Sequence, residues 1–145
     1  MRIVLQRVSQ ASVSVNGEIV GEIGKGFVAL LGVTDSDTKE TAEKMAQKIA
    51  KLRVFADAEG KTNLCQSDID GEILVISQFT LYADCTKGNR PSFTAAGSPA
   101  HACEIYEYFA DVCGGLFTRT ARGIFGAEMK VALVNDGPFT VLLEA

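Results

Sequence analysis

Two short polar segments contain the residues best suited to chemistry, and the first follows a buried strand. Ser77-Gln78-Phe79-Thr80 comes directly after the apolar residues 73–76. Ligands in α/β sheets collect at the ends of such strands, so a binding or catalytic role is one interpretation. A bend there would leave backbone N–H groups unpaired, and such groups can stabilise an oxyanion. The alternative interpretation is a strand that simply reaches the surface.

The second segment lies near the end of the chain and reads Asn135-Asp136-Gly137-Pro138-Phe139-Thr140. Asp-Gly between two strand-like runs is a hairpin signal, but the proline that follows removes a donor from the strand ladder. A cis Gly137-Pro138 bond, the isomer of about 5–6% of X–Pro bonds, would direct two carbonyls nearly parallel and form a rigid reader of small shapes. On the residues alone, an ordinary turn is the favoured interpretation.

Other reactive side chains are scarce. Arg7 shares a strand face with apolar residues, where a charge is costly unless it is paired or reaches solvent at the strand end. His101 is the only histidine, and its place near a helix start favours a surface role over catalysis. A hydrolase that pairs His101 with Cys65 or Cys85 is an alternative, which thiol alkylation without loss of activity would exclude.

Composition limits the function classes. The chain has 145 residues, a formal net charge of −4, one histidine and four cysteines. The acidic balance argues against a protein that coats nucleic-acid backbones, and so against DNA as a partner, but it is compatible with one local contact to an RNA end. A single histidine and the absence of Cys-x₂-Cys pairs argue against a metal site. We expect no metal and no cofactor.

Apolar runs and cysteine usage indicate where the protein works. The longest uninterrupted apolar run, residues 27–31, is far shorter than the roughly 20 residues of a membrane span. The N-terminal residues lack the hydrophobic region of a signal peptide. Four thiols in a domain that does not need disulfides indicate a reducing compartment. We therefore expect a cytoplasmic protein with no membrane partner.

The hydrophobic periodicity predicts one α/β domain that covers residues 1–145. Strands are predicted at residues 2–8, 11–15, 18–23, 27–33, 53–55, 73–81, 117–121, 129–134 and 139–143, with turns at 16–17 and 135–138. Helical spacing predicts one helix through residues 42–52, capped by Asp37 or Thr38, and another from Ser98-Pro99 to residue 115. We expect a mixed, strongly curved, barrel-like sheet with these two main helices packed outside it.

Together the two polar segments resemble the signature motifs of the D-aminoacyl-tRNA deacylase family. The similarity extends along the whole chain, through residues 6–8, 53–57 and 90–93. This resemblance implies a hydrolase that cleaves the ester between a D-amino acid and the 3′ end of tRNA. It also implies a homodimer in which the Gly-Pro of one subunit enters the active site of the other.

The first motif would then line the catalytic pocket, through Ser77, Gln78, Phe79 and Thr80. Thr80 is the only hydroxyl obviously placed, and no histidine or lysine accompanies it in the motif. Backbone N–H groups at Phe79 and Thr80 would hold the developing oxyanion, and the ribose 2′-hydroxyl would help to activate water. We therefore expect a Thr80→Ala variant to retain much of its activity.

The second motif would supply chiral selection. By resemblance, Gly137 and Pro138 form the chirality filter, Arg7 braces their loop, and Asn135 and Thr140 support it. Carbonyls held near the substrate Cα would clash with an L side chain and tolerate hydrogen, which predicts cleavage of D-esters and glycine esters. In similar proteins the terminal adenine is held at the positions of Phe125 and Met129.

A nucleic-acid-binding or other interaction module with the same fold but no hydrolytic activity is the second interpretation. Such a module would be expected to carry extra basic tails. The present sequence has none after its last predicted strand, which favours the enzyme.

Overall fold

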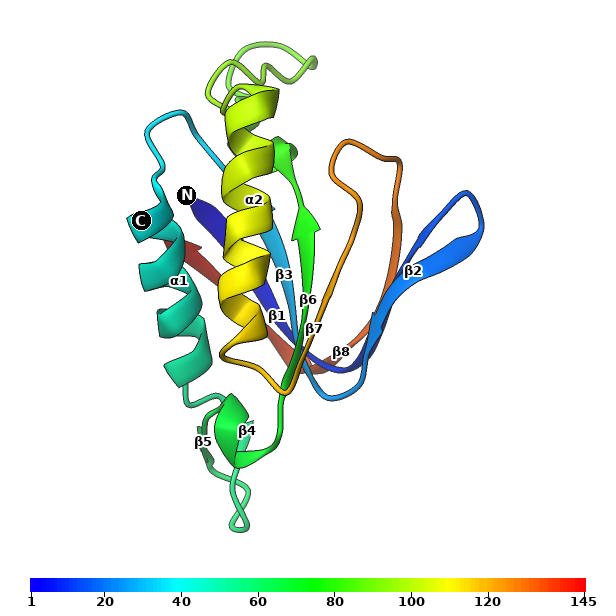
Figure 1. Cartoon of the computed structure of the whole chain (residues 1–145), viewed down its shortest axis with the longest axis vertical. Helices are drawn as coiled ribbons and strands as arrows, with labels where there is room; N and C mark the ends of the chain where they lie inside the picture. The colour runs from blue at the N-terminus through cyan, green and yellow to red at the C-terminus, as the bar shows by residue number, and fades with distance from the viewer.

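Strands from both ends of the chain form one strongly curved sheet in the computed structural model, which describes residues 1–145 (Figure 1). The strands of this sheet are β1 (Arg2–Val15), β2 (Glu18–Ile23), β3 (Gly26–Gly32), β6 (Glu72–Ser77), β7 (Arg119–Arg122) and β8 (Lys130–Glu144). Their order is β2-β1-β3-β6-β7, and β8 also pairs with β1. β1 is antiparallel to its partners, whereas β6 is parallel to β3 and β7. The sheet is therefore mixed, as the sequence predicts.

The first hairpin follows from a local turn signal. Asn16 and Gly17 adopt φ values of +51° and +81°, which suit a two-residue hairpin turn. The separate strands expected at residues 2–8 and 11–15 are one continuous strand, β1. The first half of β1 pairs with β3 and the second half with β2, so the break in apolar alternation marks a change of partner.

Both helices cover the same side of the sheet (Figure 1). They are α1 (Lys39–Lys51) and α2 (Pro99–Gly114). Thr38 is the cap of α1, because its side chain accepts a hydrogen bond from the backbone of Thr41 at 3.3 Å. Asp37 instead forms a buried ion pair, 2.5 Å from the N-terminal ammonium of Met1. This pair joins the start of the chain to the segment that leads into α1.

Apolar side chains gather on both faces of the sheet. The larger cluster, with 23 buried residues, lies between the sheet and the helices and includes Phe27 and Phe109. The smaller cluster, with 7 buried residues, lies on the opposite face and includes Val28. At the open side β2 comes so close to β7 that a Cβ on Gly21 would lie 2.9 Å from the Arg122 carbonyl oxygen. The sheet is thus curled nearly into a barrel.

Shorter elements join these parts. They are β4 (Phe55–Ala56), β5 (Thr62–Leu64) and the 3₁₀ helices η1 (Gln66–Asp68) and η2 (Phe79–Tyr82). The strand expected at 73–81 ends at Ser77, because the chain bends at Gln78 and enters η2. No helix combines the length and the apolar character required to span a membrane.

The end of the chain contains no hairpin, contrary to the sequence prediction. β8 runs from Lys130 to Glu144 without reversing, and it pairs with β1 along nearly all of its length. Residues 135–140 of β8 face only residues 6–8 of β1, so the middle of this segment bulges out of the ladder. Pro138 has no N–H to donate, which suits a position where the ladder is interrupted.

Candidate functional site

Two adjacent backbone amides follow the end of β6 and precede the first amide that is hydrogen-bonded within η2. Gln78 N donates to the Leu31 carbonyl at 2.8 Å and closes the β3–β6 ladder. The first amide bonded within η2 is that of Leu81, which donates to the Gln78 carbonyl at 3.2 Å. The N–H groups of Phe79 and Thr80 therefore have no acceptor within η2. A pair of free amides of this kind is suited to binding an oxyanion.

A largely apolar cavity of about 370 Å³ adjoins this bend. Its lining comes from the ends of β3 and β6, the loop before α2, the start of α2 and the segment after β7: Leu31, Val33, Ser77, Gln78, Phe79, Phe93, Ala96, Gly97, Pro99, Ala102, Tyr106, Phe125 and Gly126. Apolar walls with a few polar groups at one end are typical of a small-molecule site. The structure thus brings Ser77, Gln78 and Phe79 to one cavity.

Two exposed aromatic rings lie beside the cavity. Phe79 and Phe93 approach edge to face, with centroids 5.0 Å apart and planes at 67°. They remain 58% and 38% exposed. Phe93 comes from the loop before α2, which supplied no expected site residue. An aromatic side chain in a largely polar segment is the sequence signal that could have identified it.

Tyr106 holds the inner wall of the cavity in place. Its hydroxyl donates to the carbonyls of Val75 in β6 and Gly123 after β7, at 3.0 and 3.2 Å. Burial raises the pKa of Tyr106, so this hydroxyl stays neutral. The ring of Phe125 lies 5.8 Å from that of Tyr106. One residue of α2 therefore ties together the strand that leads to the free amides and the segment that carries Phe125.

No side chain in the first motif is arranged as an activated nucleophile. The Thr80 hydroxyl accepts a hydrogen bond from Gln78 Nε2 at 2.5 Å. Nucleophilic catalysis would require a base that takes the hydroxyl proton, and Gln78 Nε2 is a donor. The polar groups of the motif are therefore better suited to stabilising charge than to attacking a substrate.

The cysteine–histidine alternative finds no support in the geometry. The partner of His101 Nε2 is the Asp37 carbonyl, 2.9 Å away. Cys65 lies at the start of η1, where its thiol contacts Ser67 and Asp68. Cys85 is exposed, and no hydrogen bond joins His101 to Cys65 or to Cys85. No group of three or more His, Cys, Asp or Glu side chains is arranged to hold a metal ion.

Arg7 donates hydrogen bonds to two backbone carbonyls, one in the second motif and one in the segment that leads into β4. Nε donates to the Asp136 carbonyl at 2.8 Å, and Nη1 donates to the Val54 carbonyl at 2.5 Å. The guanidinium also lies over the Phe139 ring, 4.9 Å from its centroid. These contacts explain how a charged residue occupies an otherwise apolar face. The Gly137-Pro138 peptide bond is cis.

Asn135 and Thr140 close the base of the same bulge. Asn135 Oδ1 accepts the backbone N–H of Phe139 at 2.7 Å, and Asn135 Nδ2 donates to Thr140 Oγ1 at 2.8 Å. Gln6 Nε2 donates to the same hydroxyl oxygen at 3.3 Å. The loop is therefore held from both ends while Gly137 and Pro138 remain exposed.

The two motifs lie at different places along the sheet. Arg7 faces Phe27 on β3, whereas Ser77 faces Leu31. Phe27 and Leu31 are four residues apart, a distance of about 13 Å along a strand. One chain therefore presents the free amides and the Gly-Pro bulge at separate positions.

Comparison with known proteins places this arrangement in a family. The family described as D-Tyr-tRNA(Tyr) deacylase matches residues 4–144. The chain belongs to this family. Similar proteins include the D-aminoacyl-tRNA deacylases of Chloroflexus aurantiacus, 53% identical over all of this chain and 91% of that protein, and of Thermus aquaticus, 49% identical over 100% and 95%.

Two solved structures extend the family comparison. One is titled "c-Myc DNA Unwinding Element Binding Protein", with a TM-score of 0.89 and 40% identity over 100% of this chain and 99% of that one. The other, a probable eukaryotic D-amino acid tRNA deacylase, has a TM-score of 0.85 at 17% identity, over 98% and 97%. The second likeness shows the shared fold alone. The barrel-like sheet with two helices is thus shared with both structures.

The two residues that the family resemblance links to adenine lie in different surroundings. Phe125 lines the cavity beside the free amides. Met129 packs against the smaller apolar cluster and is not part of the cavity lining. The structure therefore brings Phe125 to the first motif and leaves Met129 outside that cavity.

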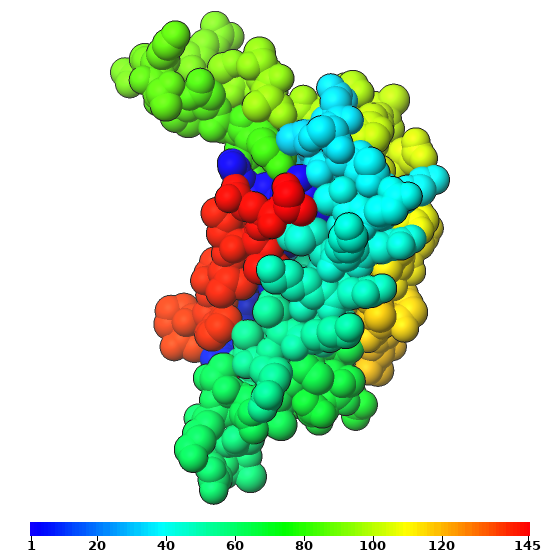
Figure 2. Space-filling model, turned by 90° about the vertical axis from the view of Figure 1, so that its left-hand side faces the viewer, coloured from blue at the N-terminus to red at the C-terminus, as the bar shows by residue number.

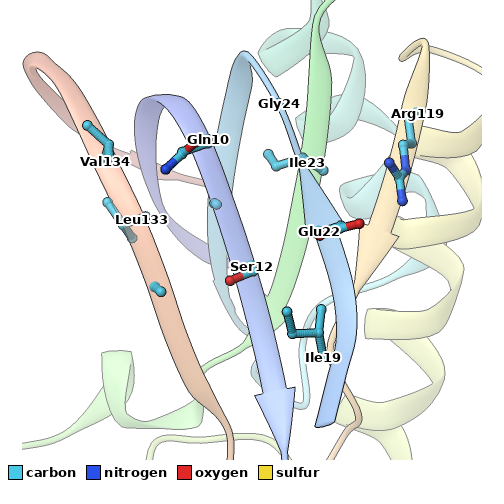
Figure 3. Close-up of a pocket in the computed structure, with 11 residues that line it drawn as sticks. Gln10, Ser12, Ile19, Glu22, Ile23, Gly24, Arg119, Leu133 and Val134 are labelled. Atoms are coloured by element: carbon cyan, nitrogen blue, oxygen red, sulfur yellow. The ribbon is translucent and has the colours of Figure 1, made fainter.

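A second cavity, of about 510 Å³, lies elsewhere on the sheet (Figure 3). Its lining comes from the neighbouring strands β8, β1 and β2 and from β7, and it includes Leu133, Gln10, Ser12, Glu22 and Arg119. It contains none of the expected site residues. Because neither motif adjoins it, the smaller cavity is the better candidate for catalysis.

Proposed function

We propose that the protein hydrolyses the ester bond that joins a D-amino acid to the 3′ end of tRNA, and that it releases the free D-amino acid and tRNA. Family membership and deacylase relatives that this chain covers over 91–95% of their length support this activity. The observation that carries the mechanism is the pair of free amides at Phe79 and Thr80 beside an apolar cavity.

In this mechanism, water attacks the ester carbonyl and the backbone binds the negative charge that develops. The carbonyl oxygen becomes an oxyanion that accepts hydrogen bonds from the Phe79 and Thr80 amides. The bond between the carbonyl carbon and the ribose 3′ oxygen then breaks, and that oxygen takes a proton. Removal of one such donor typically costs about 10²–10³ in kcat.

The substrate supplies the group that the protein lacks. No side chain that could take a proton is hydrogen-bonded to Thr80, whose hydroxyl accepts from Gln78. The 2′-hydroxyl of the terminal ribose is next to the ester and assists the attacking water. An aminoacyl ester is already reactive, so a modest reduction of the barrier suffices.

Selection between mirror images comes from Gly137 and Pro138 of the partner subunit in a homodimer. The exposed bulge, held by Arg7 and Asn135, is a rigid projection. Because the two motifs are separate along one chain, a second copy would have to bring the bulge to the cavity. Its carbonyls would meet the substrate Cα, where they exclude an L side chain and accept the hydrogen of glycine.

The terminal adenosine would occupy the cavity beside Phe125. The ring of Phe125 offers a face for base stacking, and the apolar lining requires little electrostatic contact. The family resemblance also predicts that Met129 contacts the adenine, and this stays a prediction.

DNA binding without hydrolysis is the second candidate, because a 40% identical structure carries a DNA-binding name. The net charge of −4 counts against it, since binding to DNA backbones depends on neutralising phosphates with basic side chains. A titration with duplex and single-stranded DNA distinguishes the two functions. We expect no saturable binding at physiological salt.

Two variants at one position test the mechanism. Phe79 is the first residue of η2, where proline is tolerated, so Phe79→Pro removes the amide donor and the ring together. Phe79→Ala removes only the ring and is the matched control. We expect wild type to release D-amino acid from D-aminoacyl-tRNA, and Phe79→Pro to have a kcat about 10²–10³ lower than Phe79→Ala. Equal rates for the two variants would exclude the amide of Phe79 as an oxyanion donor.

A further inference from the structure

The loop before α2 carries a projecting tip beside the cavity. Asp84 and Ser92 form a two-way backbone bridge, with N···O distances of 2.7 and 2.9 Å. This bridge closes a tip of residues 85–91, and together they form what we call the 84–92 arm. The arm extends beyond the N-terminal end of α2 at the top of Figure 1, and it projects from the rest of the molecule in Figure 2. All seven tip residues are exposed.

The tip is positively charged on a molecule that is negative overall. Its only charged residues are Lys87 and Arg90, and neither forms an ion pair. The nearby carboxylate of Asp84 is turned to the arm itself, because it accepts the hydroxyl and the backbone N–H of Thr86 at 2.7 and 2.9 Å. These hydrogen bonds lower the pKa of Asp84 and keep it ionised. Lys87 and Arg90 are therefore two exposed cations without an acidic partner.

The root of the arm is part of the cavity mouth. Phe93 follows the bridge directly, lines the cavity and packs its ring against Phe79. Gly97 then ties the chain back to the body, where its N–H donates to the Val33 carbonyl at 2.8 Å. The charged tip is therefore joined to the cavity mouth through the bridge and Phe93.

We propose that the 84–92 arm and the Phe79–Phe93 pair bind the single-stranded 3′ end of tRNA on the 5′ side of the terminal adenosine. Lys87 and Arg90 contact backbone phosphates, and the exposed rings stack on a base. Aromatic platforms beside basic side chains are the general means of holding single strands. The inference rests on the proposed function, because it requires an aminoacylated nucleotide in the adjoining cavity.

A comparison of two substrates tests the arm. The variant is Lys87→Ala with Arg90→Ala, and the matched control is Lys48→Ala with Lys61→Ala, which makes the same charge change on other exposed surfaces. The substrates are D-aminoacyl-tRNA and D-aminoacyl-adenosine, which contains no phosphate. We expect the arm variant to lower kcat/KM for D-aminoacyl-tRNA about tenfold relative to that for D-aminoacyl-adenosine, through a higher KM for the tRNA. The control variant should leave this ratio unchanged. Lys87→Arg with Arg90→Lys should restore it.

Salt dependence gives an independent readout of the same contacts. Each phosphate contact to a single strand contributes about 0.7 to the slope of log K against log salt. Loss of two contacts should lower that slope by about 1.4, so a tenfold rise in salt should weaken tRNA binding about 25-fold less in the arm variant than in wild type. The control variant should keep the wild-type slope.

Two outcomes would count against the arm, and a third would count against the proposed function. An unchanged substrate ratio and slope would exclude phosphate contacts by Lys87 and Arg90. An equal loss with both substrates, together with dissociation of the dimer, would assign the arm to contact with a second copy of the chain. Wild-type protein that cleaves neither substrate would instead overturn the proposed function itself.

Discussion

At the scale of single residues, catalysis is assigned to backbone groups, and Thr80 tests this assignment. Its hydroxyl accepts a hydrogen bond from Gln78 and has no base beside it. We expect Thr80→Ala to keep kcat within about tenfold of wild type, because the amide N–H proposed to bind the oxyanion remains. Single-turnover deacylation at saturating enzyme measures this. A loss of more than about a thousandfold with intact binding would instead support Thr80 as the nucleophile.

Gly137 tests the shape of the filter. Its φ is +137°, a conformation that L side chains rarely adopt, and a Cβ there would lie 2.8 Å from Arg7 Nη2. Alanine would therefore displace the bulge or its brace, and we expect Gly137→Ala to lose discrimination between D- and L-aminoacyl-tRNA. Gly60→Ala is the control, because Gly60 also has a positive φ, of +78°, but no atom lies within 4 Å of its added Cβ. If Gly137→Ala kept full discrimination, the filter would lie elsewhere.

At the scale of elements, the site depends on how α2 holds β6. The Tyr106 hydroxyl joins α2 to β6 and to the segment that leads to Phe125. Tyr106→Phe leaves the carbonyls of Val75 and Gly123 without that donor, which should lower the free energy of unfolding by about 1–3 kcal/mol. Urea unfolding measures the change. Tyr108→Phe is the matched control, since it removes a tyrosine hydroxyl whose partner is the Glu43 side chain rather than a buried backbone carbonyl, and it should lower the free energy of unfolding less than Tyr106→Phe does.

Local signals predicted the elements that depend on neighbours in sequence. The turn at Asn16-Gly17, the helix after Thr38 and the helix that begins at Pro99 are all formed where the sequence indicates. Each depends on conformational preferences within a few residues, so the sequence contains the required information.

Local sequence signals did not predict how distant strands pair. The segment at 135–138 has the residues of a hairpin turn, yet β1 holds both flanking strands in line and the segment becomes a bulge. Likewise, the strand expected to continue to residue 81 ends at Ser77, because the ladder to β3 ends there. Phe93 joins the cavity only through a loop whose course cannot be derived from periodicity.

For the site, the sequence identified residue types and the structure supplied their partners. The motif residues were named from a resemblance to known proteins, and the contacts of Arg7 with Asp136 and Val54 give its position a physical cause. The sequence does not single out Tyr106 among the residues of α2. Its two carbonyl partners come from separate parts of the chain, so no local pattern could reveal them.

At the scale of the whole molecule, the proposed active site combines the cavity of one chain with the Gly-Pro bulge of another. Heterodimers that combine a Phe79→Pro chain with a Gly137→Ala chain, isolated through two different tags, test this. The only active cavity then belongs to the Gly137→Ala chain, and its filter comes from the Phe79→Pro chain. We expect activity that is selective for D-aminoacyl-tRNA. Activity without selectivity would place the filter and the cavity in the same chain.

The charge distribution fits a protein that holds only the end of an RNA. A net charge of −4 does not suit a grip on a long stretch of backbone, and the two cations of the 84–92 arm would neutralise about two phosphates. Stacking and shape would therefore supply most of the affinity for the terminal nucleotides. Such binding should weaken with salt far less than that of proteins with many phosphate contacts.

The rates at which the wild-type protein deacylates matched D-, L- and glycyl-tRNA test the central claim most directly. A filter that excludes an L side chain by contact, while backbone amides perform the chemistry, predicts rapid hydrolysis of the D- and glycyl esters. Hydrolysis of the L-ester should be slower by more than about 100-fold, the factor that about 2.7 kcal/mol of clash provides. Hydrolysis of L- and D-aminoacyl-tRNA at equal rates would contradict the account.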